Sequence, residues 1–444
     1  MAEKPRAVLR AVLRFGSPRR LRRTWAWLAE IAAEVRRRRA EPRLTVAVDV
    51  NSFYEPLTGV GWYLHQILVH LAASDDLRLR LYGQSLVESD PGAPRPVVDF
   101  PAGPAVERVV HDAPDGLVIP PWRARQVLRR LAPLLAAADG NRVLFAPNYL
   151  FPPLFRLARG ARVATIHDLG VRKVPWAVRP DSGEALRYRL DRTLFEADLL
   201  LTPSEAVRRE LIEMGVAPQR VRAIHHGTGL VAEGSLSEVV ALPARTPRRY
   251  ALHVGTVEPR KNVSTLLAAW RLLRLRRADP PPLVLCGGFG WKAEEARREI
   301  GAAEAEGWLV HLGYVSAEEL AALYRGAELV ALPSFYEGFG LPAVEALRAG
   351  APLVASDLPV LREVAGDAAL YAPPDRPGLW ADRIGEILAD AGLRAGLRRR
   401  GQERARLFDW GRAAAETARA FRAALPGRVE PPPGRPDPPL PEAL

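Results

Sequence analysis

The chain has 444 residues, 48% hydrophobic and 26% charged, which is the composition of a globular enzyme and the length of two domains. Its single cysteine, Cys286, excludes an internal disulfide framework and, within an apolar run, indicates a buried thiol. The net charge is +12, but residues 1–43 hold 13 Lys and Arg against 4 Glu. The rest of the chain therefore carries only about +3, and the charge gives no general indication of a nucleic-acid partner.

Residues 1–43 are predicted to form a basic amphipathic extension. Ser17 and Pro18 suit the N-cap and the first position of a helix. That pattern suits the surface of an anionic membrane and suits packing on the body of the protein equally well, so both hypotheses stay open. The apolar residues that recur at helical spacing on one face, with arginines around them, are Leu21, Trp25, Leu28, Ile31 and Val35.

No stretch of the sequence is long and apolar enough to cross a bilayer, and the first 40 residues lack the apolar core of a secretory signal. We therefore expect a cytoplasmic protein. Peripheral attachment to the inner face of the plasma membrane is the hypothesis that the basic extension adds.

Residues 44–229 alternate short apolar runs with segments of helical character. This alternation predicts an α/β domain with a mostly parallel sheet, covered by helices on both faces. The predicted strands are residues 44–49, 143–146, 163–166 and 199–202, and the predicted helices lie near residues 59–73, 183–196 and 204–214.

The same alternation restarts after residues 230–248, a segment of weak periodicity that we predict to connect two domains. The second domain, residues 249–405, is followed by a helix at 406–425 and by a tail, 426–444, whose 8 prolines predict disorder. The predicted strands of this domain are residues 250–254, 283–286, 310–312, 329–332 and 353–355, and the predicted helices lie near 263–274, after the capping box of Ser316 and Glu319, and from Pro342.

The most informative stretch is residues 333–350, which read PSFYEGFGLPAVEALRAG. A strand precedes it, and its glycines let the backbone approach a ligand. Pro342 suits the start of a helix whose free N–H groups favour phosphate. Glu337 in the turn and Glu345 in the first turn of the helix add carboxylates that accept hydrogen bonds from hydroxyls. A diphosphate joined to a ribose and a sugar offers both kinds of group, and a strand-turn-helix without a ligand is the alternative.

Glu337 and Glu345, eight positions apart in EGFGLPAVE, resemble the paired-glutamate signature of the family 4 retaining glycosyltransferases, the group 1 glycosyl transferases of GT-B fold. The resemblance implies two facing Rossmann-like domains with parallel sheets and a C-terminal helix that crosses back to the first domain. It also implies that Glu345 binds the ribose of a nucleotide sugar and that Glu337 lies against the sugar ring. The backbone that would contact the sugar and phosphate belongs to Gly338, Phe339, Gly340 and Leu341.

Residues 255–262, GTVEPRKN, also follow a strand and open a helix. The resemblance places donor contacts at Gly255 and Thr256, although many members carry Arg where this chain has Thr256. It places an Arg and a Lys here to neutralise the diphosphate, and we assign that role to Lys261 and Arg260. Because cations at a helix N-terminus oppose the helix dipole, an anionic partner explains them better than a solvated helix start.

The first half of the chain resembles the family more loosely. Gly59 and Gly61, between the first strand and helix, would face the donor. His167 ends a strand where the family often has a His that reaches the donor sugar, and a structural role is the alternative. Phe408 and Trp410 resemble the family's F-x-W, and the resemblance covers about residues 44–422. The residues that could line the acceptor side are Asp168, Asn148 and Tyr149.

The resemblance implies a retaining transfer in which the nucleoside diphosphate departs while the acceptor hydroxyl attacks on the same face. The chain has no Asp-x-Asp triplet, which argues against the metal-dependent single-domain class, so we expect no cofactor and no divalent metal. The alternatives are a nucleotide-sugar epimerase or phosphorylase of the same fold, and a non-catalytic protein that binds glycans or membranes. An NAD-dependent oxidoreductase is not supported, because no G-x-G-x-x-G follows a strand.

The sequence EPRKN of residues 258–262 resembles family members that move mannose or rhamnose in the assembly of cell-surface polysaccharides. GDP-mannose is therefore the first hypothesis for the donor. A glycan or a lipid-linked glycan is the first hypothesis for the acceptor, whose identity is set by the loops of the first domain.

Overall fold

The computed structural model describes residues 18–54, 59–83, 96–109, 138–148, 160–179, 183–228 and 241–425. By their contacts these residues fall into two compact units. Unit 1 takes the described parts of residues 18–165, 192–200 and 414–425, and unit 2 takes those of residues 166–191 and 201–413. Ser17, Tyr149, most of the segment 230–248 and the tail from residue 426 lie outside the described residues.

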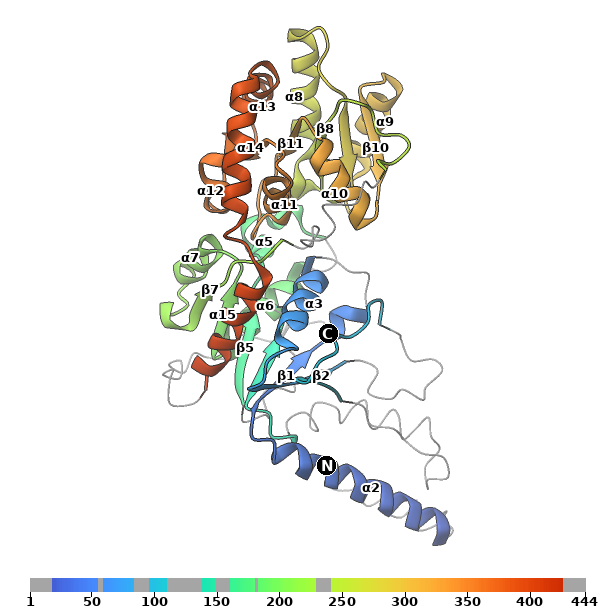
Figure 1. Ribbon diagram of the computed structural model, residues 1–444, viewed down its shortest axis with the longest axis vertical. Coiled ribbons are helices and arrows are strands. Elements are labelled where there is room, and N and C mark those ends of the chain that lie inside the picture. Colours follow the sequence, from blue (N-terminus) through green and yellow to red (C-terminus); the bar gives the residue numbers. More distant parts are fainter. Residues whose placement is uncertain are drawn as a thin grey trace. The chain divides into compact units, whose positions relative to one another are not determined.

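The first sheet has the strand order β3-β2-β1-β4-β5-β6-β7 among the described residues (Figure 1). β1 pairs in parallel with β2 and β4, and β4 pairs in parallel with β5, as the alternation of strands and helices predicts. The predicted strands 44–49, 143–146 and 199–202 are confirmed. The bounds are β1 Leu44–Asp49, β2 Leu77–Tyr82, β3 Val106–Arg108, β4 Val143–Ala146, β5 Ala161–Thr165, β6 Leu199–Thr202 and β7 Val221–Ala223.

The helices of this half of the chain also follow the sequence pattern. The predicted helix 183–196 is confirmed, and Ser204 caps the helix predicted from it by accepting from the N–H of Val207. The bounds are α2 Pro18–Arg39, η1 Asn51–Tyr54, α3 Gly59–Leu71, α5 Gly170–Lys173, η3 Pro175–Ala177, α6 Gly183–Glu196, α7 Glu205–Glu213 and η5 Pro218–Arg220.

β2 is not among the predicted strands. Its sequence, LRLRLY, alternates leucine with arginine, which is typical of a strand with one face in water. In the structure Arg80 is 1% exposed, because its guanidinium donates to the carbonyls of Asp139 at 2.9 Å and Arg38 at 2.6 Å and pairs with Glu107 at 3.3 Å. The alternation was therefore an available signal for this strand, but a buried arginine gives the same letter pattern as an exposed one, so the sequence could not show that Arg80 is buried.

α2 is anchored to unit 1 at its C-terminal end. Arg38 is 5% exposed and pairs with Glu107 at 2.9 Å and with Asp139 at 3.4 Å. Trp27 is also buried, whereas Trp25 is 69% and Leu28 44% exposed. The two buried residues are thus not among those of the predicted apolar face, of which Leu21, Ile31 and Val35 are half-buried while Trp25 and Leu28 are exposed.

The last helix, α15 (Trp410–Ala423), brings the chain back to unit 1, to which its residues belong from Ala414 onward. The ring of Phe421 lies 5.1 Å from that of Phe145 in β4. Arg422 forms an ion pair with Asp76. These contacts confirm the predicted return of the C-terminal helix to the first part of the chain.

The second sheet has the order β10-β9-β8-β11-β12-β13, and its strand pairs are parallel. The capping box of Ser316 and Glu319 is confirmed at the start of α10. The strands are β8 Ala251–Val254, β9 Leu283–Cys286, β10 Leu309–Gly313, β11 Leu329–Leu332, β12 Leu353–Ser356 and β13 Ala369–Ala372. The helices are η6 Pro259–Lys261, α8 Val263–Arg276, α9 Glu294–Ala305, α10 Ala317–Gly326, α11 Leu341–Ala349, α12 Pro359–Ala365, η7 Gly366–Ala368, α13 Pro377–Ala389 and α14 Ala391–Ala405.

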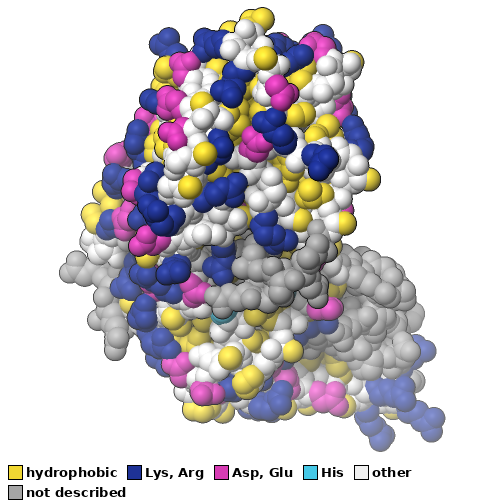
Figure 2. Space-filling model, turned by 45° about the horizontal axis from the view of Figure 1, so that its top comes forward, with side chains coloured by type: hydrophobic (Ala, Val, Ile, Leu, Met, Phe, Trp, Pro, Cys, Tyr) yellow, Lys and Arg dark blue, Asp and Glu magenta, His cyan; other side chains and the backbone are white. Residues whose placement is uncertain are grey.

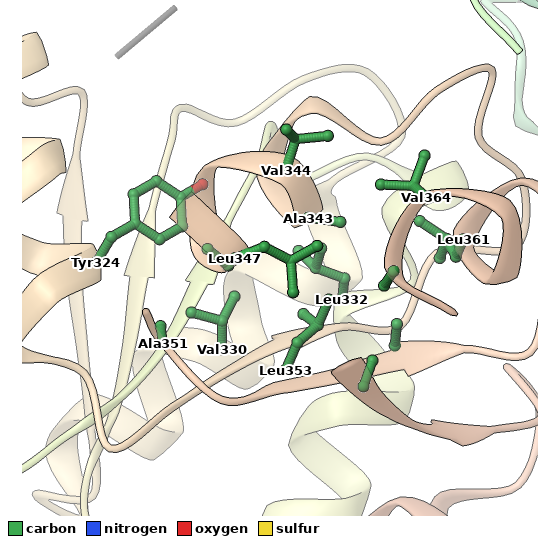
Figure 3. Packing of buried hydrophobic residues seen from close by; sticks show 14 of the residues in the cluster. Tyr324, Val330, Leu332, Ala343, Val344, Leu347, Ala351, Leu353, Leu361 and Val364 are labelled. Atoms are coloured by element: carbon green, nitrogen blue, oxygen red, sulfur yellow. The ribbon is translucent and has the colours of Figure 1, made fainter. Parts of the chain in front are cut away.

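Two cores cover the two faces of this sheet, because neighbouring residues of a strand point to opposite sides. In β11, Leu329 and Ala331 pack with α8, α9 and α13, while Val330 and Leu332 pack with α10, α11 and α12. Figure 3 shows the second core, with Leu347 of α11 lying over Val330 and Leu353. Strands buried on both faces read as continuous apolar runs, which is why the sequence placed them well.

Lys and Arg side chains are spread over the face in Figure 2, with Asp and Glu among them. Within the described residues, no helix is long and apolar enough to cross a membrane.

Candidate functional site

The loop between β11 and α11 carries the paired glutamates. It ends at Gly340, whose φ of 88° lies in the left-handed region and which is the N-cap of α11. At Gly338, a Cβ would lie 1.9 Å from the carbonyl oxygen of His167, so only glycine fits without displacing backbone. Ser204 fixes the same turn by donating to the carbonyl of Gly338 at 2.8 Å. The loop is therefore held against the residues that follow β5 and β6, all within unit 2.

Glu337 accepts hydrogen bonds from two cations and a hydroxyl. Lys261 Nζ lies 2.7 Å from its Oε1 and Arg260 Nη1 lies 3.2 Å from its Oε2. Ser334 Oγ donates to Oε1 at 2.6 Å. Burial alone would raise the pKa of Glu337, but Lys261 and Arg260 outweigh it and lower the pKa to about 2. Glu337 is therefore an ionised, weakly basic carboxylate throughout the neutral range.

The two cations come from a short turn after β8. η6 holds Arg260 and Lys261, and Asn262, at a φ of 55°, turns the chain into α8. The Asn262 amide donates to the carbonyls of Pro333 at 2.9 Å and Pro374 at 2.7 Å, which ties this turn to the start of the Glu337 loop. Because β8 and β11 are neighbours in the sheet, residues 76 positions apart meet at its carboxyl edge.

The cation pair is neutralised on both sides. Arg260 Nη2 lies 2.8 Å from Glu258 Oε1, while its Nη1 binds Glu337. Burial raises the pKa of Glu258 and outweighs the charge of Arg260, which lowers it. Lys261 also packs over Gly255, where a Cβ would be 3.5 Å from its Cδ. An ammonium has three donors, so Lys261 can bind Glu337 and still donate to a further anion.

Glu345 lies in the second turn of α11, because Gly340 is the N-cap and Leu341 the first helical residue. The expectation that it lies in the first turn is wrong, because the helix begins one residue before Pro342. Its Oε2 accepts from the hydroxyl of Tyr324 at 2.8 Å. Burial raises the pKa of Glu345 to about 7, with Tyr324 and then Lys261 opposing the shift. Figure 3 shows Tyr324 in the core beneath α11, with its oxygen toward that helix.

His167 and Asp168 follow β5 and are brought to the same loop in unit 2. The ring of His167 lies 5.5 Å from the ring of His226, which is buried. Asp168 Oδ1 accepts from the N–H of Gly170 at 2.8 Å, and its charge acts on Arg260. Tyr336 joins the two segments, since its hydroxyl accepts from the N–H of Leu169 at 2.9 Å.

A cavity of about 280 Å³ opens beside Glu337 and Tyr336. Its other walls come from the start of α12, where Leu358, Pro359 and Val360 line it, and from α7 and α5. Tyr336 donates to Glu210 on the α7 wall at 2.7 Å. Glu337 is thus one of the residues that line this cavity, although its side chain is only 11% exposed.

The other predicted site residues divide between the units. Gly255 and Thr256 follow β8, with Gly255 beside Lys261. Phe339 is buried against Phe408 with ring centroids 5.7 Å apart. Gly59, Gly61 and Asn148 lie in unit 1: the two glycines begin α3, and Asn148 follows β4. Their predicted roles toward donor and acceptor stay predictions, and Tyr149 lies outside the described residues.

Sequence reasoning missed four polar residues that support the site. Ser334 and Tyr324 bind the carboxylates, Glu258 binds Arg260, and Asn262 connects the two loops. Ser334 stands three residues before Glu337 and Glu258 two before Arg260, so proximity in sequence was an available signal. Tyr324 had none, because its hydroxyl reaches Glu345 only through the packing of α10 on α11.

No group of three or more His, Cys, Asp and Glu side chains that could hold a metal ion occurs among the described residues. The charges gathered near Glu337 are the cations of Arg260 and Lys261 and the carboxylate of Glu258. Two cations and two carboxylates therefore meet here, so a further anion would compete with Glu337 for Lys261 and Arg260.

Two family models match the chain: Glycosyltransferase Family 4 over residues 57–231 and Glycosyl transferases group 1 over residues 238–404. O-antigen chain mannosyltransferase B of Escherichia coli is 32% identical over 378 residues, covering 83% of this chain and 96% of that protein. D-inositol 3-phosphate glycosyltransferase of Salinispora arenicola is 31% identical over 400 residues, covering 83% and 88%.

The fold is shared with solved structures. Sucrose-phosphate synthase from Thermosynechococcus elongatus matches with a TM-score of 0.63 at 24% identity, covering 86% of this chain and 98% of that one. Anabaena HepE, solved in complex with UDP-glucose, matches with a TM-score of 0.60 at 19% identity, covering 85% and 99%. The paired glutamates, the two parallel sheets and these relatives lead to one conclusion: the chain belongs to the group 1 glycosyl transferases, glycosyltransferase family 4 of GT-B fold, and is a glycosyltransferase.

Proposed function

We propose that this glycosyltransferase moves a hexose from a nucleoside-diphosphate sugar, with GDP-mannose the first candidate, to a glycan or lipid-linked glycan of a cell-surface polysaccharide. The observation that carries the proposal is the Glu337 carboxylate held by Lys261 at 2.7 Å and Arg260 at 3.2 Å, at the carboxyl edge of the sheet. The name of the relative that is 32% identical, an O-antigen chain mannosyltransferase, supports mannose. The complex of HepE with UDP-glucose supports a nucleotide sugar.

The proposed reaction proceeds with retention. The bond between the anomeric carbon and the diphosphate oxygen breaks, and the acceptor hydroxyl oxygen bonds to the same carbon from the same face. The hydroxyl proton passes to the departing phosphate. Lys261 and Arg260 stabilise the charge that develops on that phosphate. A pKa of about 2 makes Glu337 a poor nucleophile, so we assign it to the sugar ring and to the placement of the two cations.

We also propose that transfer needs no divalent metal, because Lys261 and Arg260 supply positive charge at the donor position. The test is a thermal-shift screen of GDP-, UDP- and dTDP-sugars with and without EDTA. A ligand that binds only the native state raises the melting temperature by mass action. We expect GDP-mannose to give the largest shift, unchanged by EDTA. A shift abolished by EDTA would refute the metal-free mechanism, and no shift at millimolar concentration with any sugar would refute donor binding.

Nucleotide-sugar affinity is expected to rise between pH 6 and pH 8. The pKa of Glu345 is raised to about 7 by burial, and the ionised carboxylate accepts from ribose hydroxyls more strongly than the neutral acid does. Calorimetry with a nucleotide sugar measures this, since its diphosphate does not titrate in that range. Glu345→Gln should bind more weakly at pH 8 and lose the pH dependence. The same dependence in that variant would mean that another group is responsible.

The contribution of Glu345 to the stability of the unliganded protein is expected to fall as the pH rises. Because the folded pKa of Glu345 is raised, the native state holds this proton more tightly than the unfolded chain between about pH 4.5 and pH 7. The stabilisation is present in full below that range and is lost as the pH rises through 7.

We propose further that α2 attaches the protein to an anionic membrane surface, which would place it at the inner face of the plasma membrane. Exposed Trp25 and Leu28 lie on a helix with eight arginines and two glutamates. The substitution Trp25→Ala with Leu28→Ala should weaken sedimentation with phosphatidylglycerol vesicles several-fold. It leaves Arg38 and its buried ion pairs intact, which a truncation would not. Leu275→Ala, at a residue 84% exposed in unit 2, is the control, and equal binding of both variants would contradict the proposal.

A further inference from the structure

A second cavity in unit 2, of about 320 Å³, carries cations that the roles above do not use. Arg187 of α6, Arg179 after η3 and Lys292 before α9 line it, together with the carboxylate of Glu184. Val171 and Val178 give it an apolar wall. We call it the 292 cavity.

The positive charge of the 292 cavity is only partly compensated by the described residues that line it. Three cations face one carboxylate, and within the part of the chain that the structure describes none of the three forms an ion pair. Arg179 lies over the ring of Trp291 at 5.8 Å, and Lys292 Nζ donates to the carbonyl of Trp176 at 2.7 Å. Like charges that line one cavity repel each other, and a bound anion removes that repulsion.

Lys292 and the ring beneath Arg179 are held in place by contacts within the protein. Trp291 Nε1 donates to the carbonyl of Ala177 at 2.6 Å, so Trp291 and Lys292 both bind the backbone of η3. Lys292 has a φ of 52°, a conformation that is rare for residues other than glycine and is kept only where surrounding contacts impose it. A preorganised set of donors loses less entropy when it binds an anion.

Trp176, whose carbonyl accepts from Lys292 of the 292 cavity, also contacts the Glu337 loop. The exposed ring of Trp176 lies edge-on to Phe335, with ring centroids 5.2 Å apart. Phe335 N–H donates to the carbonyl of Arg260 at 2.8 Å, next to the cations that bind Glu337. An anion in this cavity would therefore belong to a molecule next to the donor site.

We propose that the 292 cavity binds the phosphate of the acceptor, a lipid-linked glycan whose phosphate meets Arg179, Arg187 and Lys292 and whose apolar chain meets Val171 and Val178. The acceptor role rests on the proposed transfer function, whereas binding of a phosphate anion does not. An inorganic phosphate has the same charge chemistry but would gain nothing from the apolar wall.

The test measures binding of farnesyl diphosphate and of inorganic pyrophosphate by calorimetry. The full chain carries Lys261→Met, so that the donor site contributes little. We expect farnesyl diphosphate to bind more tightly than pyrophosphate. Adding Arg187→Gln and Lys292→Gln should weaken both about tenfold, since each substitution removes a charge-assisted contact. Arg298→Gln, an exposed arginine of α9 outside the cavity, is the matched charge control and should change neither.

The anion site would be overturned if Arg298→Gln lowered the affinity for the probes as much as the double substitution does. It would also be overturned if the double substitution left that affinity unchanged. Equal affinity for the two probes would assign the cavity to a free anion and overturn the acceptor role. Nucleotide-sugar binding by Arg187→Gln/Lys292→Gln with Lys261 intact should match that of the unchanged protein. A chain that binds farnesyl diphosphate in this cavity but binds no nucleotide sugar would refute the transfer function and leave the anion site standing.

Discussion

Replacing Glu337 by Gln is expected to lower kcat about a hundredfold or more while tightening the binding of the nucleoside diphosphate product about tenfold. Gln keeps the shape of the side chain and the contact with Ser334, but it removes the charge that Lys261 and Arg260 share. The two cations then bind the diphosphate without competition. The sugar also loses the anionic group beside it. The substitution therefore stabilises the bound transition state less than it stabilises the bound product.

The lower kcat is measured by steady-state kinetics with the donor that the thermal-shift screen identifies. The tighter product binding is measured by calorimetry with the nucleoside diphosphate of that donor. Glu294→Gln removes an exposed carboxylate of α9 and is the control for net charge. A fall in kcat with weaker product binding would mean that Glu337 holds the diphosphate or the loop. An unchanged kcat would exclude Glu337 from the reaction.

Gly338→Ala is expected to lower the stability of unit 2 by about 1–3 kcal/mol or more and to abolish donor binding. The added Cβ would lie 1.9 Å from the carbonyl oxygen of His167 and 2.8 Å from the Cβ of Asp168. Backbone, not a flexible side chain, must move to relieve the overlap. Because Glu337 is the preceding residue, the movement shifts its carboxylate away from Lys261.

Gly301→Ala is the matched control. This glycine lies inside α9, and a Cβ there meets nothing within 4 Å. Alanine should stabilise the helix by about 0.5–1 kcal/mol and leave donor binding unchanged. Thermal unfolding and the thermal-shift response to the donor compare the two variants. A Gly338→Ala protein that behaved like Gly301→Ala would show that the contact with His167 does not position the loop.

The sequence predicted the second sheet well because its strands are buried on both faces. Residues 283–286 and 329–332 are apolar throughout and match β9 and β11. β2 was missed although its alternating residues are a strand signal, and only the structure shows that ion pairs bury Arg80, a residue type that is usually exposed. The burial of Arg38 in α2 was not predicted, because its partners Glu107 and Asp139 lie 69 and 101 positions away in the sequence.

The candidate site shows the same limit. Local motifs identified Glu337, Glu345, Lys261 and Arg260, because a strand, a glycine turn and a helix start are continuous in sequence. The motif could not show that both cations bind Glu337 itself, since that depends on β8 and β11 being neighbours. Nor could it show that burial beside Tyr324 raises the pKa of Glu345 to about 7.

The sequence by itself determined the α/β class, the family and the positions of the paired glutamates, because these depend on short segments whose periodicity and glycine placement are local. Only the tertiary structure decided which charges meet, which glutamate is ionised and which arginines are buried. Those properties depend on distance and on burial between residues far apart in the chain, and both are set when the sheets and their helices pack.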